Sequence, residues 1–166
     1  AGDVNGDGYA DLIVDAFAAA PNGANSGASY VIFGKASGFA SAINLSSLDG
    51  TTGFKLTGVA AGDMSGYSVA SAGDVNGDGY ADLIVGAYQA DANSIDSGAS
   101  YVIFGKASGF ASSINLNSLN GTNGFRLAGV AAYDNTGCSV ASAGDVNGDG
   151  FADLIIGAIG APNGLG

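Results

Sequence analysis

Three copies of one acidic loop contain most of the side chains in this sequence that could bind a metal ion. The middle copy reads Asp74-Val75-Asn76-Gly77-Asp78-Gly79-Tyr80-Ala81-Asp82, and closely similar copies lie at residues 3–11 and 145–153. Each copy has oxygen-bearing side chains at positions 1, 3, 5 and 9 and glycine at positions 4 and 6. Glycine allows the positive φ values that a tightly wound loop needs, so the alternating oxygens can converge on one point.

The oxygen ligands of these loops suit Ca²⁺, which accepts carboxylate, Asn and backbone carbonyl oxygens in flexible geometry. We therefore expect one Ca²⁺ per loop, three in all, bound by the four side chains and by the backbone carbonyl at position 7. A metal-free Asn/Gly/Asp-rich turn is the alternative, but such a turn does not need three mutually repelling carboxylates. The predicted ligands are Asp3, Asn5, Asp7, Tyr9 and Asp11 in the first loop, Asp74, Asn76, Asp78, Tyr80 and Asp82 in the second, and Asp145, Asn147, Asp149, Phe151 and Asp153 in the third.

The first half of each loop also resembles the start of an EF-hand loop. An EF-hand needs a bidentate Glu at position 12 and a helix on each side. Position 12 is Val14, Val85 or Ile156, and the sequence contains no Glu. The last side-chain ligand must therefore be the Asp at position 9, and the apolar residues that follow it predict a strand.

The composition indicates a turn-rich globular protein whose acidity is concentrated in the loops. Of 166 residues, 47% are hydrophobic, 30 are Gly and 2 are Pro, which suits an all-β protein. The formal charge is −11, all 15 acidic residues are Asp, and three per loop are predicted ligands; without these nine the balance would be −2. Only four residues are basic, which argues against a nucleic-acid partner. No apolar run is long enough to predict a membrane span.

The chain is a tandem repeat with a period of 71 residues, measured between Asp3, Asp74 and Asp145. Residues 26–35 recur unchanged at 97–106. We predict that residues 1–71 hold strands 2–4 of a first, partial blade plus the start of the next. Residues 72–142 form the second repeat, and residues 143–166 form a truncated third. Because the chain begins without Met directly at a metal loop, we expect it to be a piece of something longer.

Each complete unit is predicted to form four short antiparallel strands. In the best example they cover residues 66–73, 82–87, 99–105 and 124–130. Tandem four-stranded units with glycine turns are typical of β-propeller blades, and the metal loop would join the first and second strands. A single blade cannot bury both of its faces, so blades need neighbours. A linear stack of such units is the alternative all-β arrangement.

The sequence also predicts the structure of the long connections and leaves some strand edges unpaired. We expect the connection at residues 106–124 to carry a short helical turn that tucks Ile114, Leu116 and Leu119 against the sheet. The expected strands number three, four and two in successive units, too few for a closed ring. The open edges would carry unpaired backbone groups, which invite pairing with other blades or with copies of the same chain.

The loop and its flanks resemble the FG-GAP repeat. The resemblance rests on Gly66-Tyr67-Ser68-Val69, on the loop itself and on residues 82–87, and it covers essentially the whole chain. FG-GAP repeats build the seven-bladed β-propeller of integrin α subunits, and the family's loop between the first two strands of a blade holds Ca²⁺. The resemblance therefore implies the same ligands. The sequence departs from the family in its long period, in Asp15 where later copies have Gly, and in the absence of the usual Pro after Gly-Ala.

The resemblance implies a non-catalytic, calcium-stabilised extracellular module for adhesion or for binding a protein or glycan. The near-identity of successive repeats is more similar to bacterial surface or adhesin-type proteins than to an integrin. A structural subunit of a filament or surface layer, assembling end to end by strand complementation, is the alternative. The propeller part of a secreted hydrolase is a weaker one, because the sequence has no His, Glu or Trp and its Asp residues are better used as metal ligands.

Two N-glycosylation sequons begin at Asn44 and Asn120. Neither has its counterpart in the other repeat, so chance occurrence in an Asn- and Ser-rich connection explains them more simply. The same Ser/Asn/Gly composition gives the connections no chemistry that would identify a ligand.

Overall fold

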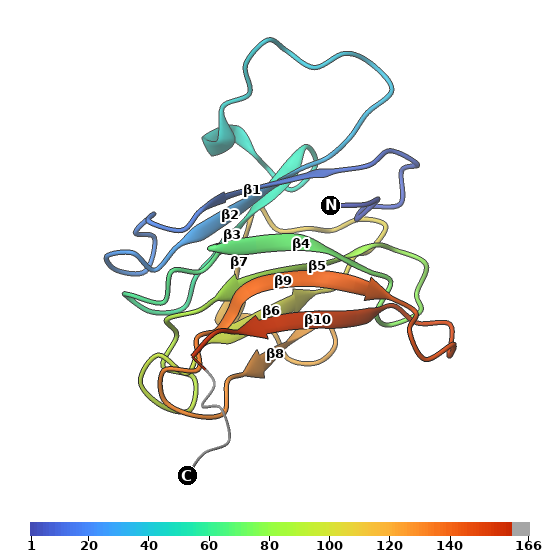
Figure 1. Cartoon of the computed structure of the whole chain (residues 1–166). Coiled ribbons are helices and arrows are strands. Elements are labelled where there is room, and N and C mark those ends of the chain that lie inside the picture. The colour runs from blue at the N-terminus through green and yellow to red at the C-terminus, as the bar shows by residue number, and fades with distance from the viewer. Residues whose placement is uncertain (161–166) are drawn as a thin grey trace.

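The computed structural model describes residues 1–160, which form three β-sheets (Figure 1). Two single-turn 3₁₀ helices are η1 (Leu45–Ser47) and η2 (Leu116–Ser118). No helix within residues 1–160 has the length and hydrophobicity that a membrane span requires. The strands in this part of the chain are β1 (Leu12–Ala16), β2 (Ala28–Ile32), β3 (Gly53–Thr57), β4 (Ser68–Gly73), β5 (Asp82–Ala87), β6 (Ala99–Ile103), β7 (Ser113–Asn115), β8 (Gly124–Ala128), β9 (Thr136–Gly144) and β10 (Asp153–Ala158).

The middle sheet comes from the second repeat and is a complete four-stranded antiparallel blade with the order β4-β5-β6-β8. Its strands cover nearly the residues predicted for them, and residues 74–81 join β4 to β5. Strands β4, β5 and β6 follow one another in the chain, whereas β6 and β8 are joined by a long connection that contains β7 and η2. The predicted fold class, tandem four-stranded antiparallel blades, is confirmed.

The middle blade buries both of its faces. Successive side chains of a strand point to opposite faces, and every residue of β5 is buried. Leu83 and Val85 belong to the core shared with the first sheet, whereas Ile84 belongs to a second core that includes Val140 of the third sheet. The uninterrupted apolar run in β5 is thus explained by a neighbour on each side.

The two outer sheets are incomplete blades. The third sheet consists of β9 and β10, and the first has the order β1-β2-β3-β7. Strand β7 is a correction to the sequence prediction. It belongs to the second repeat's connection, yet it pairs in parallel with β3 of the first repeat, with Leu56 opposite Ile114. The predicted helical turn follows it as η2, where Leu116 is buried and Leu119 packs against the same core.

Candidate metal-binding loops

The three acidic loops lie at the same end of the three sheets (Figure 1) and stack on one another. Ala81 N–H donates to the Asp3 carbonyl over 3.0 Å, and Ala152 N–H donates to the Asp74 carbonyl over 2.9 Å. The middle loop is therefore held between its two copies. Any change of shape in one loop must be accommodated by its neighbour.

Glycine at position 4 is required for two reasons, of which the sequence indicates only the first. Gly77 has φ +75°, a conformation that disfavours a side chain. A Cβ on Gly77 would also collide with the ring of Phe151, at position 7 of the next loop. Gly6 has the same relation to Tyr80. The aromatic residue at position 7 thus packs on the preceding loop, a long-range contact that spacing alone cannot predict.

The side chains at positions 1, 3 and 5 fold inward onto the backbone of their own loop. Asp74 Oδ1 accepts from the N–H groups of Gly77 and Asp78 over 2.7 and 3.1 Å, and its Oδ2 accepts from Gly79 N–H over 2.9 Å. Asn76 Oδ1 accepts from Asp78 N–H over 3.0 Å. An ionised carboxylate has about four acceptor positions, so these bonds leave lone pairs available.

The carboxylate at position 9 fastens the loop to the blade. Asp82 is fully buried, and its two oxygens accept from Val75 N–H and Gly105 N–H, each over 2.8 Å. Gly105 lies just beyond β6, so this side chain ties the loop to the third strand of its blade. Burial raises the pKa of Asp82 to about 6, and the two backbone N–H groups oppose that rise.

The carboxylate at position 9 makes the same two bonds in the first loop but, within residues 1–160, only one of them in the third. Asp11 is also buried, accepts from Val4 and Gly34 N–H groups, each over 2.7 Å, and has a pKa raised by burial. Asp153 is half-buried and accepts from Val146 N–H over 2.8 Å. In the third loop the Gly150 N–H is the main cause that lowers the pKa of Asp145.

The donor chemistry of each loop fits a hard cation, since every predicted side-chain ligand is an oxygen donor. The carboxylates of a loop do not converge on a common point in this structure. Within residues 1–160, no three His, Cys, Asp or Glu side chains are grouped closely enough to hold a metal ion. The structure thus places all fifteen predicted ligand residues in three similar loops. Their binding of Ca²⁺ stays a prediction.

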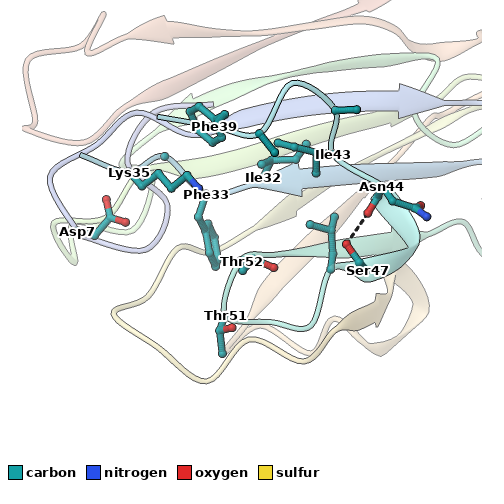
Figure 2. Close-up of a pocket in the computed structure, with 14 residues that line it drawn as sticks. Asp7, Ile32, Phe33, Lys35, Phe39, Ile43, Asn44, Ser47, Thr51 and Thr52 are labelled. Carbon is teal, nitrogen blue, oxygen red and sulfur yellow. Dashed lines mark hydrogen bonds between the residues drawn. The ribbon is translucent and has the colours of Figure 1, made fainter. Parts of the chain in front are cut away.

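Sequence analysis missed a hollow beside each of the first two loops. The first has a cavity of about 490 Å³ between the end of β2 and the connection at residues 35–52, lined by Asp7, Phe33, Phe39 and Ile43 among others (Figure 2). The second, about 630 Å³, lies at the matching place one period later. Apolar residues within the Ser- and Ala-rich connections were the available signal.

Comparison with known proteins supports the reading of the repeats. The family model described as FG-GAP repeat matches residues 65–103 and 139–166. Integrin alpha pat-2 of Caenorhabditis elegans is 39% identical over 93 residues, which cover 56% of this chain and 7% of that protein. The chain therefore spans only a small part of this relative. The expectation of a bacterial origin finds no support in these matches.

Proposed function

Because this chain belongs to the FG-GAP repeat family, we propose that it is a non-catalytic, calcium-stabilised β-propeller module that works outside the cell in adhesion or in binding a protein or glycan. One observation carries the proposal: three stacked loops present the same oxygen donors at one end of the blades. Three sites in contact would add to the packing and the backbone hydrogen bonds that already join neighbouring blades.

Electrostatics supports a cation at these loops. Each loop places three carboxylates within nine residues, and the buried one, Asp82, has a pKa raised to about 6 by desolvation. A bound cation would favour the ionised form and offset the repulsion between the carboxylates. Millimolar extracellular Ca²⁺ can fill sites of modest affinity, and the integrin relative supports an extracellular setting.

A catalytic role has little chemical basis in this chain. The sequence offers no His or Glu for general acid–base catalysis. Asp82, whose pKa burial raises to about 6, already accepts hydrogen bonds from two backbone N–H groups that anchor its loop. The repeated Asp residues are better explained as structural ligands.

Thermal unfolding followed by circular dichroism tests the calcium proposal. With about 2 mM Ca²⁺ in place of excess EGTA, we expect the melting temperature to rise by about 5–10 °C per occupied site, since a hundredfold excess over Kd adds about 2.7 kcal/mol. Asp78→Asn should reduce the rise. Asp15→Asn, which changes an exposed Asp outside the loops, is the matched control. The proposal would be overturned if the melting temperature were the same in Ca²⁺ and in EGTA while metal analysis showed that the EGTA-treated protein contains no metal.

A second candidate function is a structural subunit that assembles end to end. The observation that favours it is a free strand edge: the outer edge of β8 has no strand partner within residues 1–160, whereas the same edge of β3 holds β7. Free edges pair readily with other chains. Electron microscopy of the purified protein, with and without Ca²⁺, would separate filaments from single modules.

A further inference from the structure

The hollows beside the first two acidic loops are the same structure formed twice. All but one of the residues that line the first have a counterpart, one period later, in the lining of the second. Residue type differs at only two of these positions, where Ser113 and Asn123 take the places of Ala42 and Thr52. The volumes, about 490 and 630 Å³, lie within the range of roughly 300–1,000 Å³ that is typical of small-molecule sites.

Each hollow is built by a single repeat. The residues that line the first lie within 7–52, and those that line the second lie within 78–123. The first hollow forms beside the following blade, whose Phe110 ring lies 5.4 Å from that of Phe33. The second forms beside the preceding blade, where the same Phe110 stacks on Phe54. Because the hollow is present next to either neighbour, it is a property of the repeat and not of an uncovered edge.

The lining combines apolar surface with hydrogen-bonding side chains. Figure 2 shows Asp7 and Lys35 at one end of the first hollow and Asn44 at the other. Ile32 and Phe33, at the end of β2, contribute apolar surface and are themselves almost buried. Sites of this composition bind a ligand through apolar contact and orient it with a few polar groups.

Polar groups of the second hollow are held in place and still have bonds to give. Lys106 Nζ lies 5.0 Å from the centroid of the Phe110 ring and donates to the Gly109 carbonyl over 2.9 Å. An ammonium group has three donors, so two remain for a ligand. Asn115 Oδ1 accepts from Asn117 N–H over 2.8 Å, which fixes the side chain and leaves its amide N–H groups available.

The charges of the lining favour a neutral ligand. Among the described residues that line the second hollow, Lys106 and Asp78 are the only charged ones, and they have opposite signs. A cationic ligand would meet the ammonium group. An anionic ligand would meet the carboxylate and would approach a chain of formal charge −11. A neutral ligand rich in hydroxyl groups meets neither obstacle.

A saccharide has this chemistry, because each hydroxyl group both donates and accepts hydrogen bonds and the C–H groups of the ring provide apolar surface. We propose that each hollow binds one neutral saccharide unit of a glycan. Lys35 or Lys106 and Asn44 or Asn115 would donate to its hydroxyl oxygens. The inference rests on the proposed function and names the glycan as the partner.

Repetition makes such a site useful even when a single contact is weak. The hollows recur with the period of 71 residues, so one chain presents the same site more than once. A glycan with several equal units would occupy more than one hollow, and the second contact then forms at a high effective concentration.

Saturation-transfer difference NMR of the whole protein, in the Ca²⁺ buffer of the melting experiment, tests the ligand class. The probes are the methyl glycosides of glucose, galactose, mannose and N-acetylglucosamine, with methyl glucuronide and methyl glucosaminide as anionic and cationic comparisons. We expect saturable binding of at least one neutral glycoside and weaker binding of both charged ones. Binding of no neutral glycoside, or tighter binding of a charged one, overturns the proposal.

Filling the hollows tests the place. Ala42→Phe combined with Ser113→Phe puts a ring into both hollows and should abolish saccharide binding. Ser41→Phe combined with Ser112→Phe introduces the same side chain one residue earlier, at exposed positions outside both linings, and should leave binding unchanged. Circular dichroism confirms that each variant is folded. Binding that survives in the filled variant overturns the hollow as the site.

Removing the ammonium groups tests the contact without filling the hollow. Lys35→Met combined with Lys106→Met keeps apolar stems of similar length and should weaken binding about tenfold or more, as the loss of a hydrogen bond to a charged group does. Lys55→Met, which lies outside both hollows, is the matched control. Equal binding by these variants overturns the assigned contact. Failure of every saccharide while Ca²⁺ still raises the melting temperature would reject this inference alone and leave the calcium proposal standing.

Discussion

Strands β1, β5 and β10 have nearly the same sequence and three different environments. In β5, Leu83 and Ile84 are fully buried. Their counterparts in the outer blades, Leu12 in β1 and Ile155 in β10, are 56% and 62% exposed. The strands themselves form equally well, each antiparallel to its neighbours. The difference lies in what covers each face.

The exposed faces of the outer blades show which side chains serve which neighbour. Leu12 and Leu83 share one position, and Leu83 packs toward the preceding blade. Ile84 and Ile155 share the next position, and Ile84 packs toward the following blade. A blade in a repeat array therefore derives much of its stability from its neighbours. The same substitution should have very different effects at the three positions.

Leu83→Ala should be the most damaging of the changes that test this comparison. It removes a fully buried side chain from the core between the first two blades, so we expect a loss of about 3 kcal/mol in the free energy of unfolding. Leu12→Ala should cost less than about 1 kcal/mol, because that side chain is mostly in water. Urea unfolding followed by circular dichroism would measure both.

The two variants control for each other, since residue type and strand position are the same. A similar loss in both would mean that the face of β1 is covered in solution. Association of copies through the outer blades would then have to be considered, and repeating the measurement at tenfold lower protein concentration would reveal it.

The middle blade could be predicted from sequence because its signals are local. Apolar runs such as residues 82–87 and the glycine turns between them identify the strands without reference to neighbours. Strand β7 could not be predicted in this way. Its three residues Ser113, Ile114 and Asn115 carry no strand pattern, and their pairing depends on Phe110 meeting a ring from the preceding repeat.

The acidic loops could likewise be predicted from sequence only in their local features. Spacing indicates which residues could converge, and the positive φ of Gly77 and Gly79 agrees with that reasoning. The bond from Gly105 N–H to Asp82 and the packing of Phe151 over Gly77 join residues far apart in the chain. Such contacts arise from the stacking of the blades, so the sequence of one loop does not contain them.

Gly86→Ala should destabilise the protein more than Gly157→Ala, its counterpart one period later. A Cβ on Gly86 would collide with the backbone carbonyl of Gly137, whereas the nearest atom to one on Gly157 would be the Cys138 sulfur at 3.3 Å. Backbone cannot yield as a side chain can, so we expect a cost of about 1–3 kcal/mol for Gly86→Ala and little change for Gly157→Ala. Differential scanning calorimetry would compare the two variants.

This pair isolates close packing from strand propensity, because Ala replaces Gly in a strand in both cases. An equal cost at the two positions would show that the backbone approach to Gly137 does not decide the outcome. Asp15 already occupies the matching position in β1, where a side chain is accommodated.

The smallest expected effect concerns Asp63, in the turn between the first two blades. This residue is 7% exposed, its Oδ2 accepts from Ala60 N–H over 2.9 Å, and burial raises its pKa, with a further contribution from Asp91. A raised pKa means that the folded state holds the proton more tightly than the unfolded chain. Protonated Asp63 therefore stabilises the folded state fully at pH values below the usual pKa of 3.8. This contribution is lost as pH rises through the higher folded-state pKa.

The difference in unfolding free energy between the native protein and Asp63→Asn should accordingly fall as pH is raised from acid toward neutrality. Urea unfolding in EGTA across that pH range measures this difference. The pH dependence that the acidic loops contribute cancels in it, because both proteins have the same loops. Asp91→Asn should lessen the dependence, since it removes a like charge contributed by the neighbouring blade. A difference that is constant with pH would mean that Asp63 ionises equally in both states, and the junction between the blades would then be wetter than its burial indicates.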